Sequence, residues 1–113
     1  MHELGVVFEV VKTVENFAKR NGVTKIDTVV LQIGELSSAI PRYVEACYPA
    51  AVDGTMLQET QLKIEILPGN ALCKHCNKVF NIVENKGKCP HCTSKEFEIL
   101  CGKEFLIKEI VAY

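Results

Sequence analysis

The chain has 113 residues, of which 48% are hydrophobic and 24% are charged, and its formal net charge at pH 7 is -1. This length allows one modest α/β core with a small appendage and excludes a large active-site barrel. The near-neutral charge gives no general attraction to nucleic-acid phosphates, and no apolar run reaches the roughly 20 residues of a membrane-spanning helix. We therefore expect no nucleic-acid partner and no membrane association.

The first predicted element is an amino-terminal helix. Apolar residues recur at helical spacing over 4–18, which places them together on the expected buried face: Leu4, Val7, Phe8, Val11, Val14 and Ala18. Asn21-Gly22 is expected to end the helix, because both residues tolerate the left-handed conformation. A largely buried strand is predicted next, over 25–33, where β-branched and apolar residues are bounded by glycines.

A second helix is predicted after this strand. Ser37 or Ser38 is expected to cap it, and Pro41 is acceptable in its first turn. Pro49 is expected to kink or shorten the helix, because proline lacks the N–H that an interior position needs. We expect the helix to end near Asp53.

Two further strands are predicted on either side of a segment rich in Cys, Lys and Asn. Apolar and polar residues alternate over 61–67, as in a half-buried strand. Residues 103–111 predict a strand with Phe105, Ile107 and Val111 on one face, and we expect it to rejoin the first sheet. The intervening residues 71–101, which we call the cysteine lobe, lack helical periodicity.

The expected fold class is therefore α+β. A small three-stranded sheet carries two helices in the order α-β-α-β, cysteine lobe, β, and the lobe is an insertion that resembles a zinc ribbon. Two domains are expected: residues 1–70 together with 102–113, and the cysteine lobe, 71–101. Pro68-Gly69 and Cys101-Gly102 could act as hinges between them.

The chain's six cysteines point to metal binding. Glu3 stands where a signal peptide would have a basic start, so we expect a cytoplasmic protein, in which a disulfide framework is disfavoured. Two Cys-x-x-Cys knuckles with twelve residues between them predict a closed, structural Zn(II) site, with an iron–sulfur cluster as the alternative. The four ligands of this site are Cys73, Cys76, Cys89 and Cys92.

The other cysteines and two of the histidines receive simpler interpretations. Cys47 is expected to pack in the core, and Cys101 is interpreted as a small apolar residue rather than a ligand. His75 and His91, inside the knuckles, are interpreted as exposed or as neighbours of the ligands, with exchange for a knuckle cysteine as the alternative.

His2 at the start of the chain has a particular coordination chemistry. The terminal amine, the His2 amide nitrogen and the imidazole can form fused chelate rings, a nitrogen-rich tetragonal set that suits Ni(II) or Cu(II). Glu3 could add an amide nitrogen or a carboxylate. The positive end of the first helix opposes a bound cation, so deprotonated amides and Glu3 would have to offset it.

In combination, four features of the sequence resemble the HypA/HybF family of nickel-insertion proteins: the opening Met-His-Glu, Gly34-Glu35-Leu36-Ser37 after the first strand, the two knuckles and the returning strand. The resemblance covers essentially the whole chain. The chain departs from many members of this family in Gly5-Val6-Val7 and in having no carboxylate between Leu36 and Pro41. Glu35 is then either a turn residue or an added metal ligand.

This resemblance implies a nickel metallochaperone rather than an enzyme. It implies Ni(II) bound as transient cargo by His2 with Glu3 assisting, in the 1–70 plus 102–113 domain, and structural Zn(II) in the cysteine lobe. The implied partners are a HypB-type GTPase, the large subunit of [NiFe]-hydrogenase and, in some organisms, urease maturation proteins. The alternative function is a zinc-ribbon module for nucleic acid or protein, which the lysines of the lobe favour and its glutamates oppose.

Overall fold

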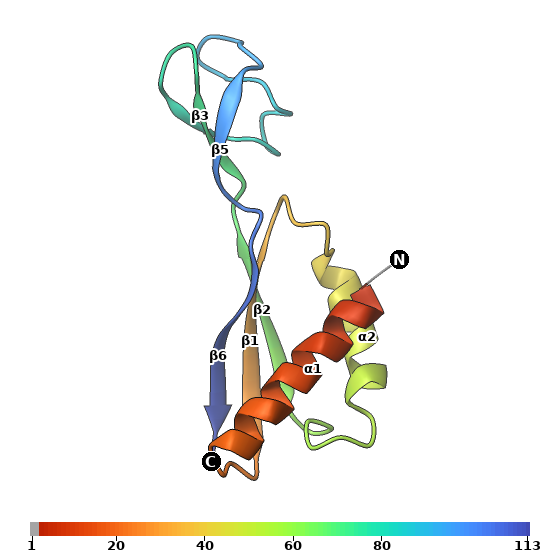
Figure 1. The fold of residues 1–113 in the computed structure, drawn as a ribbon. Helices are drawn as coiled ribbons and strands as arrows, with labels where there is room; N and C mark the ends of the chain where they lie inside the picture. Colours follow the sequence, from red (N-terminus) through yellow and green to blue (C-terminus); the bar gives the residue numbers. More distant parts are fainter. Residues whose placement is uncertain (1–2) are drawn as a thin grey trace.

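The computed structural model describes residues 3–113, which form a helix-covered sheet and a second, smaller sheet arranged end to end (Figure 1). The principal extents are 54 × 27 × 16 Å, so the two sheets lie along one long axis. The elements follow in the order α1 (Glu3–Arg20), β1 (Ile26–Gly34), α2 (Pro41–Val52), β2 (Gln61–Leu67), β3 (Asn70–Cys73), β4 (Val79–Asn81), β5 (Phe97–Cys101) and β6 (Phe105–Ala112). This order confirms the predicted α+β fold.

Helix α1 packs one apolar face on the sheet, and this face differs slightly from the predicted one. Val10 belongs to the buried set, which is Glu3, Val7, Val10, Val11, Val14 and Ala18. Leu4 and Phe8, which we expected to be buried, are 37% and 49% exposed. The 3.6-residue period places Phe8 at the edge of the apolar face, where the sheet no longer covers it.

The helix-covered sheet has the strand order β2-β1-β6. Strand β1 lies in the centre, parallel to β2 and antiparallel to β6, which explains why it is buried along almost its whole length. The prediction that the last strand rejoins the first sheet is confirmed. Helices α1 and α2 cover one face of this sheet (Figure 1).

A β-bulge in β6 changes which of its residues face the core. Val30 pairs with Glu109 but Leu31 pairs with Ile107, so the ladder skips Lys108. One extra residue reverses the inward and outward alternation beyond it. Ile110 packs on the core and Val111 is 40% exposed, so the predicted inward position of Val111 is wrong.

Helix α2 begins without the predicted serine cap. Its N-cap is Ile40, whose side chain makes no capping hydrogen bond, whereas Ser37 Oγ accepts a bond from Ala39 N–H in the preceding turn. Pro41 occupies the start of the helix as expected. Pro49 does not end the helix, which continues to Val52, because only one backbone hydrogen bond is lost near its carboxyl end.

The two helices and the sheet enclose a single apolar cluster, and the lobe has a separate, smaller one. Cys47 packs against the larger cluster, as predicted. The most deeply buried large side chains of the larger cluster include Leu31 and Ile33 of β1 and Leu57, which precedes β2. Neither helix within residues 3–113 has the length and hydropathy of a membrane span.

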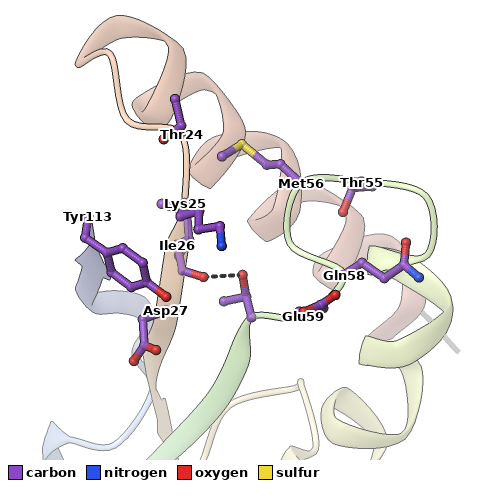
Figure 2. A pocket seen from close by; sticks show the side chains of 10 residues that line it. Thr24, Lys25, Ile26, Asp27, Thr55, Met56, Gln58, Glu59 and Tyr113 are labelled. Carbon is purple, nitrogen blue, oxygen red and sulfur yellow. Dashed lines mark hydrogen bonds between the residues drawn. The ribbon is translucent and has the colours of Figure 1, made fainter.

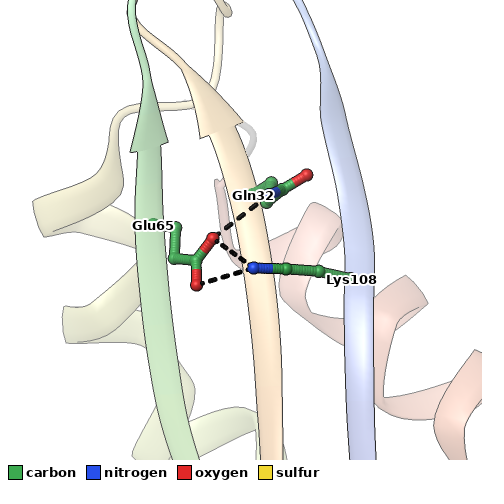
Figure 3. Close-up of polar contacts among 3 residues, drawn as sticks. All are labelled: Gln32, Glu65 and Lys108. Carbon is green, nitrogen blue, oxygen red and sulfur yellow. Dashed lines mark hydrogen bonds and ion pairs between the residues drawn. The ribbon is translucent and has the colours of Figure 1, made fainter.

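The sheet face away from the helices carries a group of polar side chains. Lys108 Nζ of β6 lies 3.0 and 3.1 Å from the two carboxylate oxygens of Glu65 on β2, and Gln32 of β1 donates to Glu65 at 3.1 Å (Figure 3). These side chains connect both edge strands across the central strand. The lysine of the β6 bulge therefore has a partner on the opposite edge of the sheet.

Candidate metal centre

The four knuckle cysteines converge at the outer end of the cysteine lobe. Their sulfur atoms all lie within 4.8 Å of one another. Cys73 Sγ is 3.4 Å from Cys92 Sγ, and Cys76 Sγ is 3.6 Å from Cys89 Sγ, so each close pair joins one knuckle to the other. A tetrahedral ion with metal–sulfur bonds of about 2.3 Å requires sulfur separations of about 3.8 Å. The cluster fits one such ion.

The two knuckles have the same backbone geometry. In the first, Cys73 N–H donates to Lys78 O and Asn77 N–H donates to Cys73 O, both at 2.9 Å. In the second, Cys89 N–H donates to Ser94 O and Thr93 N–H donates to Cys89 O, again at 2.9 Å. These turns direct both thiols of each knuckle to the same side.

The residue after each second cysteine adopts a left-handed conformation. Asn77 has φ 59° and Thr93 has φ 65°. Asparagine enters this region readily, whereas a β-branched threonine does so at a cost. The second knuckle adopts this turn although threonine is unfavourable there. A metal ion bound by both thiols of the knuckle would offset that conformational cost.

The electrostatics of the four thiols also favour a cation between them. Backbone donors at Cys76 and His75 lower the pKa of Cys73 to about 6. The backbone N–H of Ser94 acts in the same direction on Cys92, but burial and the three neighbouring thiols raise its pKa to about 12. Four crowded thiolates repel one another, so they coexist when a positive ion neutralises them.

The cysteine lobe has little apolar core to support this arrangement. Its buried members are Ala71, Cys73, Phe80 and Cys89, and Phe80 packs edge-on against Phe97 with ring centroids 5.6 Å apart. Two of these four buried residues are themselves candidate ligands. A lobe this small depends on metal–ligand bonds for much of its stability.

Other candidate ligands lie outside the cluster. His75 and His91 are exposed, as predicted, and neither belongs to the group of four cysteines. Cys101 Sγ donates instead to Pro68 O at 3.4 Å. Within residues 3–113, the four knuckle cysteines are the one group of three or more Cys, His, Asp or Glu side chains arranged to hold a metal ion.

His2, the predicted nickel ligand, lies outside the described residues. Glu3 is described and is only 3% exposed. Its Oε2 accepts a hydrogen bond of 3.3 Å from Ile40 N–H, which belongs to the N-cap of α2. The carboxylate therefore lies beside the positive ends of both helices, a favourable place for a negative charge.

Glu35 has a role that the sequence did not reveal. Its Oε1 accepts hydrogen bonds from Gly69 N–H at 2.8 Å and from Asn81 Nδ2 at 2.9 Å. The side-chain bond from Asn81 and the backbone bond from Gly69 lower the pKa of Glu35. No local sequence pattern signals this contact, because Glu35 and Asn81 are 46 residues apart.

A cavity of about 470 Å³ lies at the other end of the molecule, where β1 begins and β2 approaches it. Figure 2 shows its wall, in which Thr60 Oγ1 donates to Ile26 O at 2.7 Å. Lys25, Asp27 and Glu59 provide its charged groups. The described residues that line it include Met56 but no cysteine or histidine, so the cavity offers neither the thiolate nor the imidazole ligands that are usual at a zinc site.

Comparison with known proteins relates the chain to a family over nearly its full length. A family model described as hydrogenase/urease nickel incorporation, metallochaperone, HypA, matches residues 1–112. The hydrogenase maturation factor HypA of Dechloromonas aromatica (strain RCB) is 34% identical over 110 residues, which are 97% of each chain. The hydrogenase maturation factor HybF of Salmonella typhimurium is 32% identical, again over 97% of each chain.

Solved structures give the same result. The solution structure of the nickel metallochaperone HypA from Helicobacter pylori matches with a TM-score of 0.66 and 28% identity, over 99% of this chain and 97% of that one. A second solution structure of a HypA protein matches with a TM-score of 0.70 and 28% identity, over 100% and 97% of the two chains. The chain belongs to the HypA family of hydrogenase/urease nickel-incorporation metallochaperones.

Proposed function

We propose that this chain carries Ni(II) for hydrogenase maturation and binds it through His2 with the help of Glu3. The family to which the chain belongs supports the cargo. The position of Glu3 supports the place: it begins α1, directly after His2 in the sequence, on the side of the helix-covered sheet nearer the cysteine lobe (Figure 1). A few nitrogen ligands would hold nickel firmly enough to carry it and loosely enough to transfer it.

The contacts of Glu3 favour its amide nitrogen over its carboxylate as the nickel ligand. The carboxylate is buried and already accepts a hydrogen bond from Ile40 N–H. The amide of Glu3, in contrast, directly follows His2 and can extend the chelate rings that begin at the terminal amine. The hydrogen-bond ladder of α1 uses N–H groups beyond its first turn, so deprotonation of this amide would leave the ladder intact. The carboxylate nearby offsets the positive end of the helix.

We infer that the resident ion of the four-cysteine cluster is Zn(II). Four thiolates close enough to share one ion match a closed tetrahedral site, in which zinc has a structural rather than a catalytic role. An iron–sulfur cluster distributes its cysteines over different iron atoms and separates their sulfurs more widely than one ion does. Cys73, Cys76, Cys89 and Cys92 would hold the ion and so fold the lobe.

We further propose a division of labour between two domains. Residues 1–70 with 102–113 would bind nickel, and residues 71–101 would bind zinc, because the two hydrophobic clusters fall on opposite sides of this division. Membership of the family implies partners in hydrogenase maturation. A HypB-type GTPase, the large subunit of [NiFe]-hydrogenase and urease maturation proteins are the partners we propose, in the cytoplasm.

A host that lacks its own family member tests this function. Expression of the wild-type chain should restore hydrogenase activity, whereas expression of His2→Ala should not, and added nickel should partly replace the missing chaperone. His91→Ala is the matched control because it removes an exposed histidine of the cysteine lobe. Full hydrogenase activity with His2→Ala at low nickel would contradict the proposed nickel site.

A further inference from the structure

The helix-covered sheet and the cysteine lobe meet at a junction formed by residues 34–36, 67–70 and 101–104. Glu35 N–H donates to Leu67 O at 2.8 Å, and Leu36 N–H donates to Gly102 O at 2.7 Å. The turn after β1 is thereby bonded to both segments that connect the sheet to the lobe, the one that enters the lobe and the one that leaves it. Figure 1 shows these two segments running side by side between the sheets.

Three glycines make this junction close-packed. A Cβ at Gly34 would overlap the carbonyl of Gly102, and a Cβ at Gly102 would lie 2.5 Å from Gly69 Cα. A Cβ at Gly69 would lie 2.7 Å from Leu36 Cγ. The glycines therefore allow the segments to approach one another. The hypothesis that Gly69 and Gly102 are hinges does not account for this packing.

One side chain extends from the junction to β4, an edge strand of the lobe's sheet. Glu35 Oε1 accepts from Gly69 N–H and also from Asn81 Nδ2, and Asn81 is the last residue of β4. Asn81 is held in turn, because its Oδ1 accepts from Glu84 N–H at 2.8 Å. Gly69 O accepts from Ile82 N–H at 2.8 Å, beside the same contact.

We propose that Glu35 is the positioning residue that fixes the orientation of the cysteine lobe relative to the helix-covered sheet. Two extended segments alone can twist about their common axis. The Glu35–Asn81 hydrogen bond opposes this twist because it attaches the sheet to β4, a strand of the lobe that neither connecting segment includes. Glu35 thereby also sets the position of the four cysteines relative to the start of α1.

Replacement of Glu35 separates this role from a general effect on folding. Both hydrogen bonds end on the same oxygen, Oε1, which a glutamine amide retains. Glu35→Gln should therefore keep the orientation of the lobe, whereas Glu35→Ala should lose it. Glu45→Ala is the control, because it removes an equally negative but exposed side chain from the surface of α2.

The measurement is a set of residual dipolar couplings and ¹⁵N relaxation rates on zinc-loaded, nickel-free protein. In the wild type, Glu35→Gln and Glu45→Ala, one alignment tensor should fit the amides of both sheets. In Glu35→Ala, the couplings of lobe amides should need a second, smaller tensor while zinc content stays at the wild-type level. A single, unchanged tensor for Glu35→Ala would overturn the proposal.

A second variant covers the case in which Glu35→Ala does not fold. Asn81→Asp keeps an acceptor for Glu84 N–H but replaces the amide nitrogen that donates to Glu35 and, at 3.3 Å, to Asn70 Oδ1 by a carboxylate oxygen. Two carboxylates would then face each other, and the lobe should again need its own tensor. Addition of Glu35→Gln should restore one tensor, because the glutamine amide can donate to the carboxylate that Asn81→Asp introduces. Persistence of two tensors in that double variant would count against the proposal.

Discussion

Cys73 Sγ lies 3.4 Å from Cys92 Sγ, although the two residues are 19 positions apart. This contact joins the end of β3 to the second knuckle and closes the loop between them. The lobe's small hydrophobic cluster includes the same cysteines, whereas the larger cluster of the helix-covered sheet includes no residue of the lobe. Metal binding should therefore control the folding of the lobe without controlling that of the sheet.

Chelation of the metal tests this independence. Removal of zinc, or Cys92→Ser, should unfold the lobe, because metal–thiolate bonds supply most of the stability that a hydrophobic core would otherwise provide. The helical circular dichroism of α1 and α2 should remain, and NMR amide signals should collapse only for residues 71–101. Cys47→Ser is the control, since Cys47 lies outside the group of four candidate ligands and packs against the hydrophobic cluster of the helix-covered sheet. Cooperative loss of both sheets on chelation would show that they fold as one unit.

Glu3 should contribute to stability through its carboxylate. Glu3→Ala removes the acceptor of Ile40 N–H and a negative charge at two helix ends, which should cost about 1–3 kcal/mol in the free energy of unfolding. Glu3→Gln keeps an acceptor oxygen and should cost less. Urea denaturation followed by circular dichroism measures both. Equal stability of all three proteins would refute the structural role of the carboxylate.

Glu3→Gln also separates the effect of the carboxylate on stability from its effect on nickel binding. If Glu3 offers nickel its amide nitrogen, Glu3→Gln should bind nickel with nearly the affinity of the wild type in a calorimetric titration. A loss of nickel binding as large as that of His2→Ala would instead assign the carboxylate as a ligand.

The pair Glu65–Lys108 should give the sheet a pH-dependent contribution to stability. The hydrogen bond from Gln32 and then the contacts with Lys108 lower the pKa of Glu65 below 4.5 in the folded protein. A lowered folded pKa means that this contribution is complete above about pH 4.5 and is lost as the pH falls through the folded value. The stability difference between wild type and Glu65→Gln, measured by urea denaturation, should therefore shrink below pH 4.5. A difference that grows on acidification would have the wrong sign.

The difference in burial between two leucines of the same sheet predicts that their replacement by alanine lowers the free energy of unfolding by very different amounts. Leu31 of β1 is 1% exposed and Leu106 of β6 is 41% exposed. Leu31→Ala should cost about 2–5 kcal/mol because it leaves a cavity in close-packed surroundings. Leu106→Ala should cost much less, because its side chain is already partly in water. Similar losses for the two variants, measured by urea denaturation, would contradict the described packing.

Local patterns in the sequence predicted most of the fold. Alternation over 61–67 and the helical period over 4–18 correspond directly to β2 and α1. The details that failed depend on tertiary contacts. Leu4 and Phe8 of α1 are more exposed than their helical spacing predicted. The bulge at Lys108, which turns Val111 outward, is defined by pairing with β1, and the start of α2 is stabilised without a serine cap.

The metal centre could be predicted more completely than its surroundings. The spacing of the knuckles was sufficient to predict that Cys73, Cys76, Cys89 and Cys92 converge, and their sulfurs do converge. Family membership confirms that the chain is a metallochaperone rather than an enzyme. The contact of Glu35 with Asn81 could not be predicted, because it brings together two residues from unrelated local patterns.

The most direct test of the central claim is a nickel titration of untagged, zinc-loaded protein, with His2→Ala and the control His91→Ala measured in parallel. Calorimetry and the nickel absorption spectrum should reveal one nickel site in the wild type and in His91→Ala. The same site should be absent in His2→Ala, while its zinc content and circular dichroism remain unchanged. Wild-type nickel affinity in a folded, zinc-loaded His2→Ala protein would contradict the proposal that nickel binds at the start of the chain.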